Sequence, residues 1–574
     1  MTMRVAFLAV SLGIVTSCLS HRAAGAADAP RPNILVILAD DMGFSDIGCY
    51  GGEVATPNLD RLAANGLRFT NFYNTARCCP TRASLLTGLY PHQAGVGHMV
   101  EDQGAPGYRG RLNDRCATIA ETLGDAAWRG GGAYHPMMVG KWHVGEQRPH
   151  WPVDRGFRRF FGLVSGGSNY WKLDGHRIMA EDDRRIQPYD TECAEDFYFT
   201  DAFTHYAVRF LDEHATSAKH ADKPFFLYLA YTAPHWPLHA RKKDIDKYRG
   251  RYMHGWDRLR EERRRNMIEL GLIDKDTPLS PRDGRVPAWD TLSEEQKRDW
   301  DLRMAVYAAQ IDAMDRGIGQ VLRKLDEQNQ LDNTLILFLS DNGGCAEVID
   351  QSEKKGTPPG SAEGFLSYGI GWANASNTPL RLYKHFVHEG GISTPLIVHW
   401  PRGIDAGRRG KWVKDPGHVI DIAATCLDVA GAKQPQSRDG KEILPLEGVS
   451  LLPALRGQPI RRGKPIFWEH EGNRAVRDGK WKLVAKGRRG PWELYDIDAD
   501  RTESSDLAGS QPQRVKRMAE QWEQWALRTH TKPWPRPRQT PAAKARNAVK
   551  DVAKDVVKRA ATAPPQAKPE PAEK

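Results

Sequence analysis

A continuous apolar segment from Asn33 to Ala39 constrains the fold of this chain more than any other feature. Such a run is typical of a strand that a parallel sheet buries on both faces. Comparable runs recur at Phe225 to Tyr231, Thr334 to Leu339 and Pro395 to Trp400. Helical patterns accompany them, at 117–127, 201–213 and 302–328. Strands that alternate with helices predict an α/β fold whose large, mostly parallel central sheet is flanked by helices.

The pattern changes after about residue 462. Four short strand signals follow, at 465–468, 474–477, 481–485 and 492–495. Turn-forming pairs such as Asp478-Gly479 separate them, which favours a small antiparallel sheet with a helix at 511–528 packed on it. We therefore expect a main domain over 31–462 and a C-terminal α+β subdomain over 463–530. Residues 236–300 are charged and rich in loop signals, so we expect a long excursion over the sheet there.

Much of the net charge of +10 comes from the C-terminal end of the chain. From Arg536 to Lys574 there are ten Lys or Arg against four Asp or Glu, a balance of +6. This stretch is rich in Ala, Pro and Lys and has no aromatic residue, so we expect a disordered basic tail over 536–574. Because the remaining body is nearly neutral, its charge gives no reason to expect nucleic acid as a partner.

The N-terminus has the pattern of a signal peptide over 1–27. Arg4 precedes an apolar stretch from Val5 to Val15, and small residues at 23–27 suit a cleavage site. The apolar stretch is too short to span a bilayer, and we expect no transmembrane segment elsewhere. We expect an exported protein, periplasmic or secreted. The segment ending at Cys18 also resembles a bacterial lipobox, which leaves open a lipid anchor through that residue.

The eight cysteines show no CxxC spacing, which argues against a thiolate zinc site. Export would permit disulfides, but their pairing cannot be read from spacing. If Cys18 is removed with the signal peptide, an odd number remains, so at least one thiol stays unpaired. The cysteines stand at positions 18, 49, 78, 79, 116, 193, 345 and 426.

Polar doublets follow two of the predicted strands. Asp40-Asp41 comes directly after the first strand, and Asp341-Asn342 comes after the third. In open α/β sheets, ligands bind outside the carboxyl ends of the strands. Three carboxylates and an amide form an all-oxygen donor set that suits Ca²⁺ or Mg²⁺. Each doublet alone also fits an ordinary turn, and their recurrence at two strand ends favours a metal site.

The segment from Arg77 to Gly88 contains a cysteine at an expected helix start. Pro80 suits the first helical turn, and Arg82 lies four residues after Cys78. A thiol in such a positive environment is suited to activation, and the same place could hold an anion. The plainer interpretation is a loop entering a helix with an incidental pair of cysteines.

Cys78-x-Pro80-x-Arg82, followed by Leu86-Thr87-Gly88, resembles the signature of the formylglycine-dependent sulfatases of the alkaline phosphatase superfamily. Thr81 stands where that family usually has Ser or Ala. The likeness extends from about Arg31 to His530 and is greatest to the arylsulfatase branch over 371–400. Further segments resemble the family, at 140–145, 155–157, 160–162, 233–237, 377–381, Lys384 and 389–391.

The resemblance implies an alkaline-phosphatase-like sandwich and makes 31–462 the catalytic domain. It also implies that a maturation enzyme oxidises Cys78 to formylglycine, whose gem-diol attacks the sulfate ester and forms a sulfated-enzyme intermediate. Arg82 would stabilise the hydrated aldehyde, His143 would deprotonate its second hydroxyl, and His235 would protonate the leaving oxygen. Two lysines would bind sulfate oxygens, Lys141 and Lys384. Ca²⁺, or alternatively Mg²⁺, would be held by Asp40, Asp41, Cys78, Asp341 and Asn342.

The expected function is therefore that of an arylsulfatase-like sulfuric ester hydrolase, with an aryl sulfate or a sulfated carbohydrate as substrate. A phosphonate monoester or phosphodiester hydrolase on the same scaffold is the alternative. A calcium-dependent glycan-binding protein without activity is disfavoured, because every expected site position is occupied by the expected residue type. The loops expected to select the substrate, 165–193 and 236–300, contain no pattern that identifies it.

Overall fold

A computed structural model describes residues 31–124 and 133–535 of the chain. The expected signal peptide and the expected basic tail lie outside these residues. Every element described below belongs to one unit of the chain, which begins at Pro32. Among the described residues, no helix combines the length and apolar composition required to cross a membrane.

The predicted central sheet is present, and its middle strands are parallel. β1 (Asn33–Ala39) pairs in parallel with β7 (Phe225–Ala230) on one side and with β8 (Thr334–Ser340) on the other. β7 pairs with β3 (His135–Gly140), and β3 pairs with β4 (Arg159–Leu163), again in parallel. All residues of β3, β7 and β8 are buried, as expected for strands with a core on both faces.

One edge of the sheet departs from the predicted parallel arrangement. β9 (Ser393–His399) corresponds to the fourth apolar run but pairs antiparallel with both β8 and β2 (Leu67–Tyr73). An apolar run reports burial and carries no information on strand direction, so the sequence could not show this. Shorter strands extend or flank the sheet, at β5 (Met179–Glu181), β6 (Arg184–Ile186), β10 (Lys411–Val413) and β11 (Gly417–His418).

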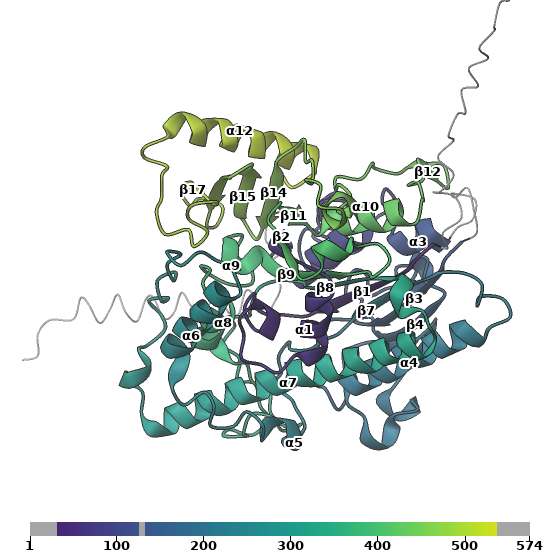
Figure 1. The fold of residues 1–574 in the computed structure, drawn as a ribbon, viewed down its shortest axis with the longest axis horizontal. Helices are drawn as coiled ribbons and strands as arrows, with labels where there is room; N and C mark the ends of the chain where they lie inside the picture. Colours follow the sequence, from purple (N-terminus) through teal and green to yellow (C-terminus); the bar gives the residue numbers. More distant parts are fainter. Residues whose placement is uncertain (1–30, 125–132, 536–574) are drawn as a thin grey trace, which may run out of the picture. The chain divides into compact units, whose positions relative to one another are not determined.

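Helices cover both faces of the sheet (Figure 1). Leu35 and Ile37 of β1 pack in one core with α4 (Phe199–Thr216) and α7 (Glu294–Glu327). The alternate residues of β1 pack in a second core with α10 (Ile420–Val429). The opposite orientation of successive side chains in a strand explains this division. Further helices of this part of the chain are α1 (Pro57–Ala64), α2 (Cys78–Thr87), α3 (Ile119–Gly124), α8 (Gly369–Ser376), α9 (Glu389–Ile392) and α11 (Leu452–Leu455).

The segment 236–300 contains more helix than its charge pattern suggested. α5 (Lys242–Ile245) and α6 (Gly255–Glu269) lie within it, and α7 begins at Glu294 rather than near Leu302. Ser293 caps α7 by accepting a hydrogen bond from the backbone N–H of Gln296 at 3.2 Å. The first turns of α7 are charged and contain few apolar residues. The amphipathic period that would reveal the start of the helix in the sequence is therefore absent.

The C-terminal part contains the predicted four-stranded antiparallel sheet and a helix above it (Figure 1). Buried Trp522 and Trp525 of α12 (Pro512–Arg528) pack against this sheet. Lys482 ties the sheet to the main body, since its Nζ lies 2.8 Å from Glu389 of α9. Small β12 (Ser437–Arg438) and β13 (Lys441–Glu442) form a separate pair. The four strands are β14 (Ile466–His470), β15 (Asn473–Asp478), β16 (Trp481–Ala485) and β17 (Glu493–Asp496).

Candidate functional site

The carboxyl ends of four parallel strands meet at one edge of the sheet. Asp40-Asp41 follow β1, Asp341-Asn342 follow β8, and Lys141 follows β3 directly. His235 follows β7 after a short turn, and α2 brings Cys78 to the same edge. Because the parallel strands β8, β1, β7 and β3 are neighbours in that order, these side chains lie together, although more than 300 positions separate Asp40 from Asp341. Every one of these side chains is buried.

Asp40 is fully buried between two cations. Its Oδ2 lies 2.6 Å from Lys141 Nζ and 3.5 Å from Arg82 Nη2. Burial raises the pKa of this carboxyl, but Lys141, His235 and Arg82 outweigh burial and lower the pKa to about 2. Asp40 is therefore ionised at neutral pH. Its other oxygen, Oδ1, has no hydrogen-bond partner within the described residues.

Asp41 contacts a different group of side chains from Asp40. Lys384 Nζ lies 2.8 Å from its Oδ2, and His235 Nε2 lies 3.5 Å from the same atom. Asn342 Nδ2 donates to Oδ1 of Asp41 at 2.7 Å. The backbone of Asp41 has a φ of +65°, a conformation that costs of order 1–3 kcal/mol in a residue other than Gly. The local backbone is thus held in the conformation that directs this carboxylate into the site.

Arg82 links the helix that carries Cys78 to the end of β8. Its Nε and Nη2 lie 3.1 and 2.8 Å from Asp341 Oδ2, and its Nη1 donates to the Lys141 carbonyl at 2.6 Å. Thr81 strengthens the link, because its hydroxyl donates to the Asp341 carbonyl at 2.6 Å. Position 81, where the sequence departs from the family pattern, therefore still supplies a hydroxyl group, as a serine would.

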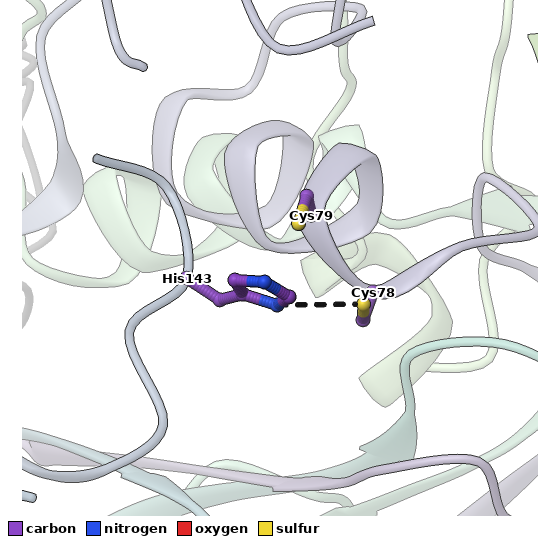
Figure 2. A group of neighbouring side chains, drawn as sticks. All are labelled: Cys78, Cys79 and His143. Carbon is purple, nitrogen blue, oxygen red and sulfur yellow. Dashed lines mark hydrogen bonds between the residues drawn. The ribbon is translucent and has the colours of Figure 1, made fainter. Parts of the chain in front are cut away.

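Cys78 is the first residue of α2 and is only 2% exposed. Its Sγ lies 3.5 Å from His143 Nδ1, and Figure 2 shows the imidazole directed at this sulfur. A hydrogen bond from Cys79 lowers the pKa of Cys78 well below its usual range, with Lys141 and His143 adding to the effect against burial. Burial raises the pKa of Cys79 well above its usual range. Cys78 is thus the activated thiol of the pair.

All seven cysteines within the described residues are free. The question of disulfide pairing that spacing left open is settled for this part of the chain: no pair forms there. The thiol of Cys78 is therefore not consumed by a disulfide within the described residues.

The oxygen atoms at the strand ends fit a hard cation. Asp40 Oδ1 and Asn342 Oδ1 are both buried without a hydrogen-bond partner in the described residues, which is unusual unless a further group satisfies them. Ligand atoms of Asp40, Asp41 and His235 lie within 4.8 Å of one another. Asp341 adds a further buried carboxylate, the pKa of which is raised by burial and by Asp40. Carboxylate and amide oxygens are the donors that Ca²⁺ and Mg²⁺ prefer.

The sequence pattern did not reveal Glu347, which borders the site. Its Oε2 accepts a hydrogen bond from Trp236 Nε1 at 2.8 Å and lies 4.0 Å from Lys384 Nζ. Burial raises the pKa of Glu347, but Lys384, His385 and Arg77 lower it well below its usual range. Its loop position, in a segment without a period or motif, left no signal by which it could be recognised.

Comparison with known families supplies the class of the protein. The family model described as Sulfatase matches residues 32–432, and a model described as the C-terminal part of N-sulphoglucosamine sulphohydrolase matches residues 381–528. The fold and these matches define a sulfuric ester hydrolase of the alkaline phosphatase superfamily. The chain belongs to the sulfatase family, which confirms the resemblance seen in its sequence.

Curated relatives agree with this assignment. An uncharacterised sulfatase from Schizosaccharomyces pombe is 35% identical over 532 residues, covering 86% of this chain and 93% of the relative. An arylsulfatase from Klebsiella aerogenes is 35% identical over 458 residues, covering 75% of this chain and 93% of the relative.

Solved structures agree as well. The structure of Ps i-CgsB in complex with k-i-k-neocarrahexaose shares 26% identity, with a TM-score of 0.64 and coverage of 92% and 99% of the two chains. A phosphonate monoester hydrolase of Agrobacterium radiobacter shares 21% identity with a TM-score of 0.53, covering 87% of this chain and 96% of the other, which shows a common fold.

Proposed function

We propose that this sulfatase uses Cys78, oxidised to formylglycine, as the nucleophile in the hydrolysis of sulfate esters. The observation that carries the proposal is the contact between Cys78 Sγ and His143 Nδ1, 3.5 Å apart, in a site that also contains Lys141, Arg82 and Asp40. The hydrated aldehyde would supply two hydroxyls, one to attack sulfur and one through which sulfate is later expelled. A plain thiol or serine has no second hydroxyl, so turnover would stall after the first step.

The side chains around position 78 suit the release of sulfate. Burial lowers the pKa of His143 to about 4, so its imidazole is neutral at physiological pH and can accept a proton from the second hydroxyl. Arg82, held by Asp341, would stabilise the hydrated aldehyde by hydrogen bonding. Lys141, next to Asp40, would bind a sulfate oxygen and offset its negative charge.

A second group of side chains suits the leaving group. His235 and Lys384 both lie beside Asp41 Oδ2. We assign His235 as the general acid that protonates the leaving oxygen, and Lys384 as a ligand of the sulfate group. The leaving alkoxide of a sulfate ester is a poor leaving group, so its protonation lowers the barrier substantially.

We further propose that Asp40, Asp41, Asp341, Asn342 and position 78 hold Ca²⁺, with Mg²⁺ as the alternative ion. The cation would neutralise charge on a sulfate oxygen and lower the pKa of the nucleophile. The oxygen-rich donor set and the two unpartnered oxygen atoms support this assignment.

Replacement of the proposed nucleophile tests the mechanism. The variant Cys78→Ala, produced in a host with a formylglycine-generating enzyme, should lose aryl sulfatase activity while its circular dichroism and melting temperature match the parent. The matched control Cys79→Ala should retain activity. Peptide mass spectrometry of the parent should show position 78 as an aldehyde rather than a thiol. Full activity in Cys78→Ala, or an unmodified thiol in fully active enzyme, would contradict the proposal.

A phosphonate monoester or phosphodiester hydrolase is the alternative within this superfamily. The discriminating measurement is kcat/KM for an aryl sulfate against the matching aryl phosphate diester under identical conditions. Preference for the sulfate supports the arylsulfatase-like activity proposed here, and preference for the diester favours the alternative.

We propose a sulfated carbohydrate or an aryl sulfate as the substrate and an exported, periplasmic or secreted location. The carbohydrate proposal is supported by the ligand of the Ps i-CgsB structure, k-i-k-neocarrahexaose, and the location by the N-terminal pattern of the sequence. Sulfate release from a set of sulfated mono- and oligosaccharides, measured beside an aryl sulfate, would test the first proposal. Fractionation of the producing cell with N-terminal sequencing of the mature protein would test the second and distinguish cleavage from a lipid anchor at Cys18.

A further inference from the structure

A cluster of three imidazoles and a carboxylate lies beside the proposed active site and has no part in the mechanism above. His98 belongs to the loop after α2, His385 to the loop between α8 and α9, and His470 to the end of β14. Glu471 follows in the turn between β14 and β15. Ligand atoms of His385, His470 and Glu471 all lie within 4.8 Å of one another. Segments from three distant parts of the chain thus direct metal-binding side chains at one point.

We propose that His98, His385, His470 and Glu471 form a second cation site, suited to a transition metal such as Zn²⁺. The three ring nitrogens nearest Glu471 lie at 3.1 Å (His98 Nε2), 3.2 Å (His385 Nδ1) and 3.7 Å (His470 Nε2) from its carboxylate oxygens. Donor atoms bound to tetrahedral zinc at 2.0–2.1 Å are separated from one another by about 3.3 Å. The distances from the three ring nitrogens to the Glu471 oxygens are therefore close to those between two ligands of one zinc ion.

His470 provides an independent reason to expect a ligand. Its side chain is fully buried, yet neither ring nitrogen has a hydrogen-bond partner within the described residues. Burying an imidazole without satisfying its nitrogens is costly, and a cation bound at Nε2 of His470 would satisfy the nitrogen that faces Glu471. The nitrogen-rich set differs from the oxygen donors at the strand ends, so the two sites would select different ions.

The side chains around the cluster orient its histidines, as a metal site requires. His385 Nε2 lies 3.1 Å from Glu347 Oε1, so the ring nitrogen away from the proposed ion can donate to a carboxylate. Such a carboxylate partner is a regular feature of metal-binding histidines. Asn473 Nδ2 donates to the backbone carbonyls of His385 and His470, each at 3.0 Å, and fixes the two segments relative to each other.

Charge around the cluster permits a divalent ion. Arg77 Nη1 lies 2.8 Å from His385 Nδ1, the ring nitrogen offered to the ion, so a bound cation would displace the guanidinium from it. Arg77 is also paired with Glu347 at 3.5 Å, which can retain it. The carboxylates of Glu347 and Glu471 together contribute two negative charges. Glu471 and His98 keep 37% and 28% of their side chains exposed, so an ion can reach the cluster from solvent.

A zinc titration of the full-length protein tests the proposal. In calorimetry with ZnCl₂ and excess CaCl₂, the parent should bind one equivalent of zinc at this cluster. Glu471→Gln and His98→Asn should each weaken this binding at least tenfold and abolish the rise in melting temperature that zinc causes. His205→Asn, which alters another exposed histidine–glutamate pair, should bind zinc like the parent. Added Co²⁺ should give the visible absorption of a tetrahedral site in the parent and in His205→Asn only.

A different group of potential metal ligands, which contains two cysteines, makes one more variant necessary. Cys78, Cys79 and His143 also bring potential ligand atoms within 4.8 Å of one another, so zinc could bind an unmodified Cys78. The variant Cys78→Ser removes that thiolate and should still bind one equivalent of zinc at the cluster. The proposal is overturned if the parent binds no zinc, if Glu471→Gln binds it with unchanged affinity, or if Cys78→Ser alone abolishes binding. None of these measurements depends on sulfatase activity.

Discussion

Lys384 Nζ lies 2.8 Å from Asp41 Oδ2, although 343 positions separate the two residues in the chain. Both side chains are almost completely buried, so the pair lies in a medium of low dielectric constant. Burial alone would lower the pKa of Lys384, but Asp41, Cys345 and Glu347 together outweigh it and raise the pKa well above its usual range. Lys384 is therefore a permanent cation at the site, which suits it to bind the anionic sulfate group.

We expect Lys384→Met to lower kcat/KM for an aryl sulfate by about 10²–10³, because it removes a charged donor to the sulfate group. The variant also leaves Asp41 with fewer partners, so its melting temperature should be measured alongside its kinetics. Lys480→Met is the matched control, since Lys480 is half-exposed and pairs with Asp496 in the C-terminal sheet. Unchanged kinetics in a folded Lys384→Met protein would remove Lys384 from the proposed site.

Removal of the divalent cation should abolish aryl sulfatase activity, and added CaCl₂ should restore it. Asn342→Leu should weaken the restoring effect of Ca²⁺ at least tenfold, because Asn342 Oδ1 is a buried oxygen atom without another partner in the described residues. Asn71→Leu, which alters a partly buried asparagine of β2, is the control. A calcium titration of activity after dialysis against chelator measures both effects, and calcium-independent activity would argue against the assignment.

Thr81 should contribute to stability through its hydroxyl group. The group donates to the Asp341 carbonyl and contacts Thr75 Oγ1 at 2.9 Å, and all three residues are buried. Thr81→Val keeps the shape but leaves these groups unpaired, so we expect a loss of about 1–3 kcal/mol in the free energy of unfolding. Thr81→Ser should retain most of it. Denaturant titrations would compare the two variants, and a loss in Thr81→Ser as large as that in Thr81→Val would show that the hydroxyl is not the main contribution.

Stability should fall at acid pH through Glu389. Burial raises the pKa of Glu389, but Lys482, Arg501 and Arg477 outweigh burial and lower it to about 2. A carboxyl with a depressed pKa stabilises the folded state above its unfolded pKa of about 4.3. We expect this contribution, on the order of 2–3 kcal/mol, to be lost as the pH falls from there through about 2.

The variant Glu389→Gln isolates this effect from those of other acidic residues. Its free energy of unfolding should be lower than that of the parent at pH 7, and the difference should shrink towards pH 2. Urea titrations at several pH values provide the measurement. A constant difference between the parent and the variant over this range would show that ionisation of Glu389 does not stabilise the fold.

Apolar runs predicted β1, β7 and β8 closely, because strands buried on both faces require uninterrupted apolar residues. The antiparallel direction of β9 was missed, since direction depends on which strands are neighbours. The strands β2 and β3 were missed as well, because polar or proline residues interrupt their apolar pattern.

For the site, spacing predicted polar doublets at strand ends, and motif resemblance added the lysines and histidines. The structure brings all of these side chains to one edge of the sheet. It also reveals Glu347 and the cluster around His470, which no motif marks. Most residues that contact these side chains lie in loops and turns. Such segments have no periodic sequence pattern from which a contact could be predicted.

By itself, the sequence determined the α/β class, the separate C-terminal sheet and the membership of the sulfatase family, because these depend on local pattern and motif. Only the tertiary structure decided which charges face each other: Lys141 with Asp40, and Lys384 with Asp41. The first pairing follows from the order of strands in the sheet, which brings the ends of β1 and β3 to one edge, and the second depends on the loop between α8 and α9, which carries Lys384. The electrostatics of a buried site depend on distances between side chains, and folding alone sets those distances.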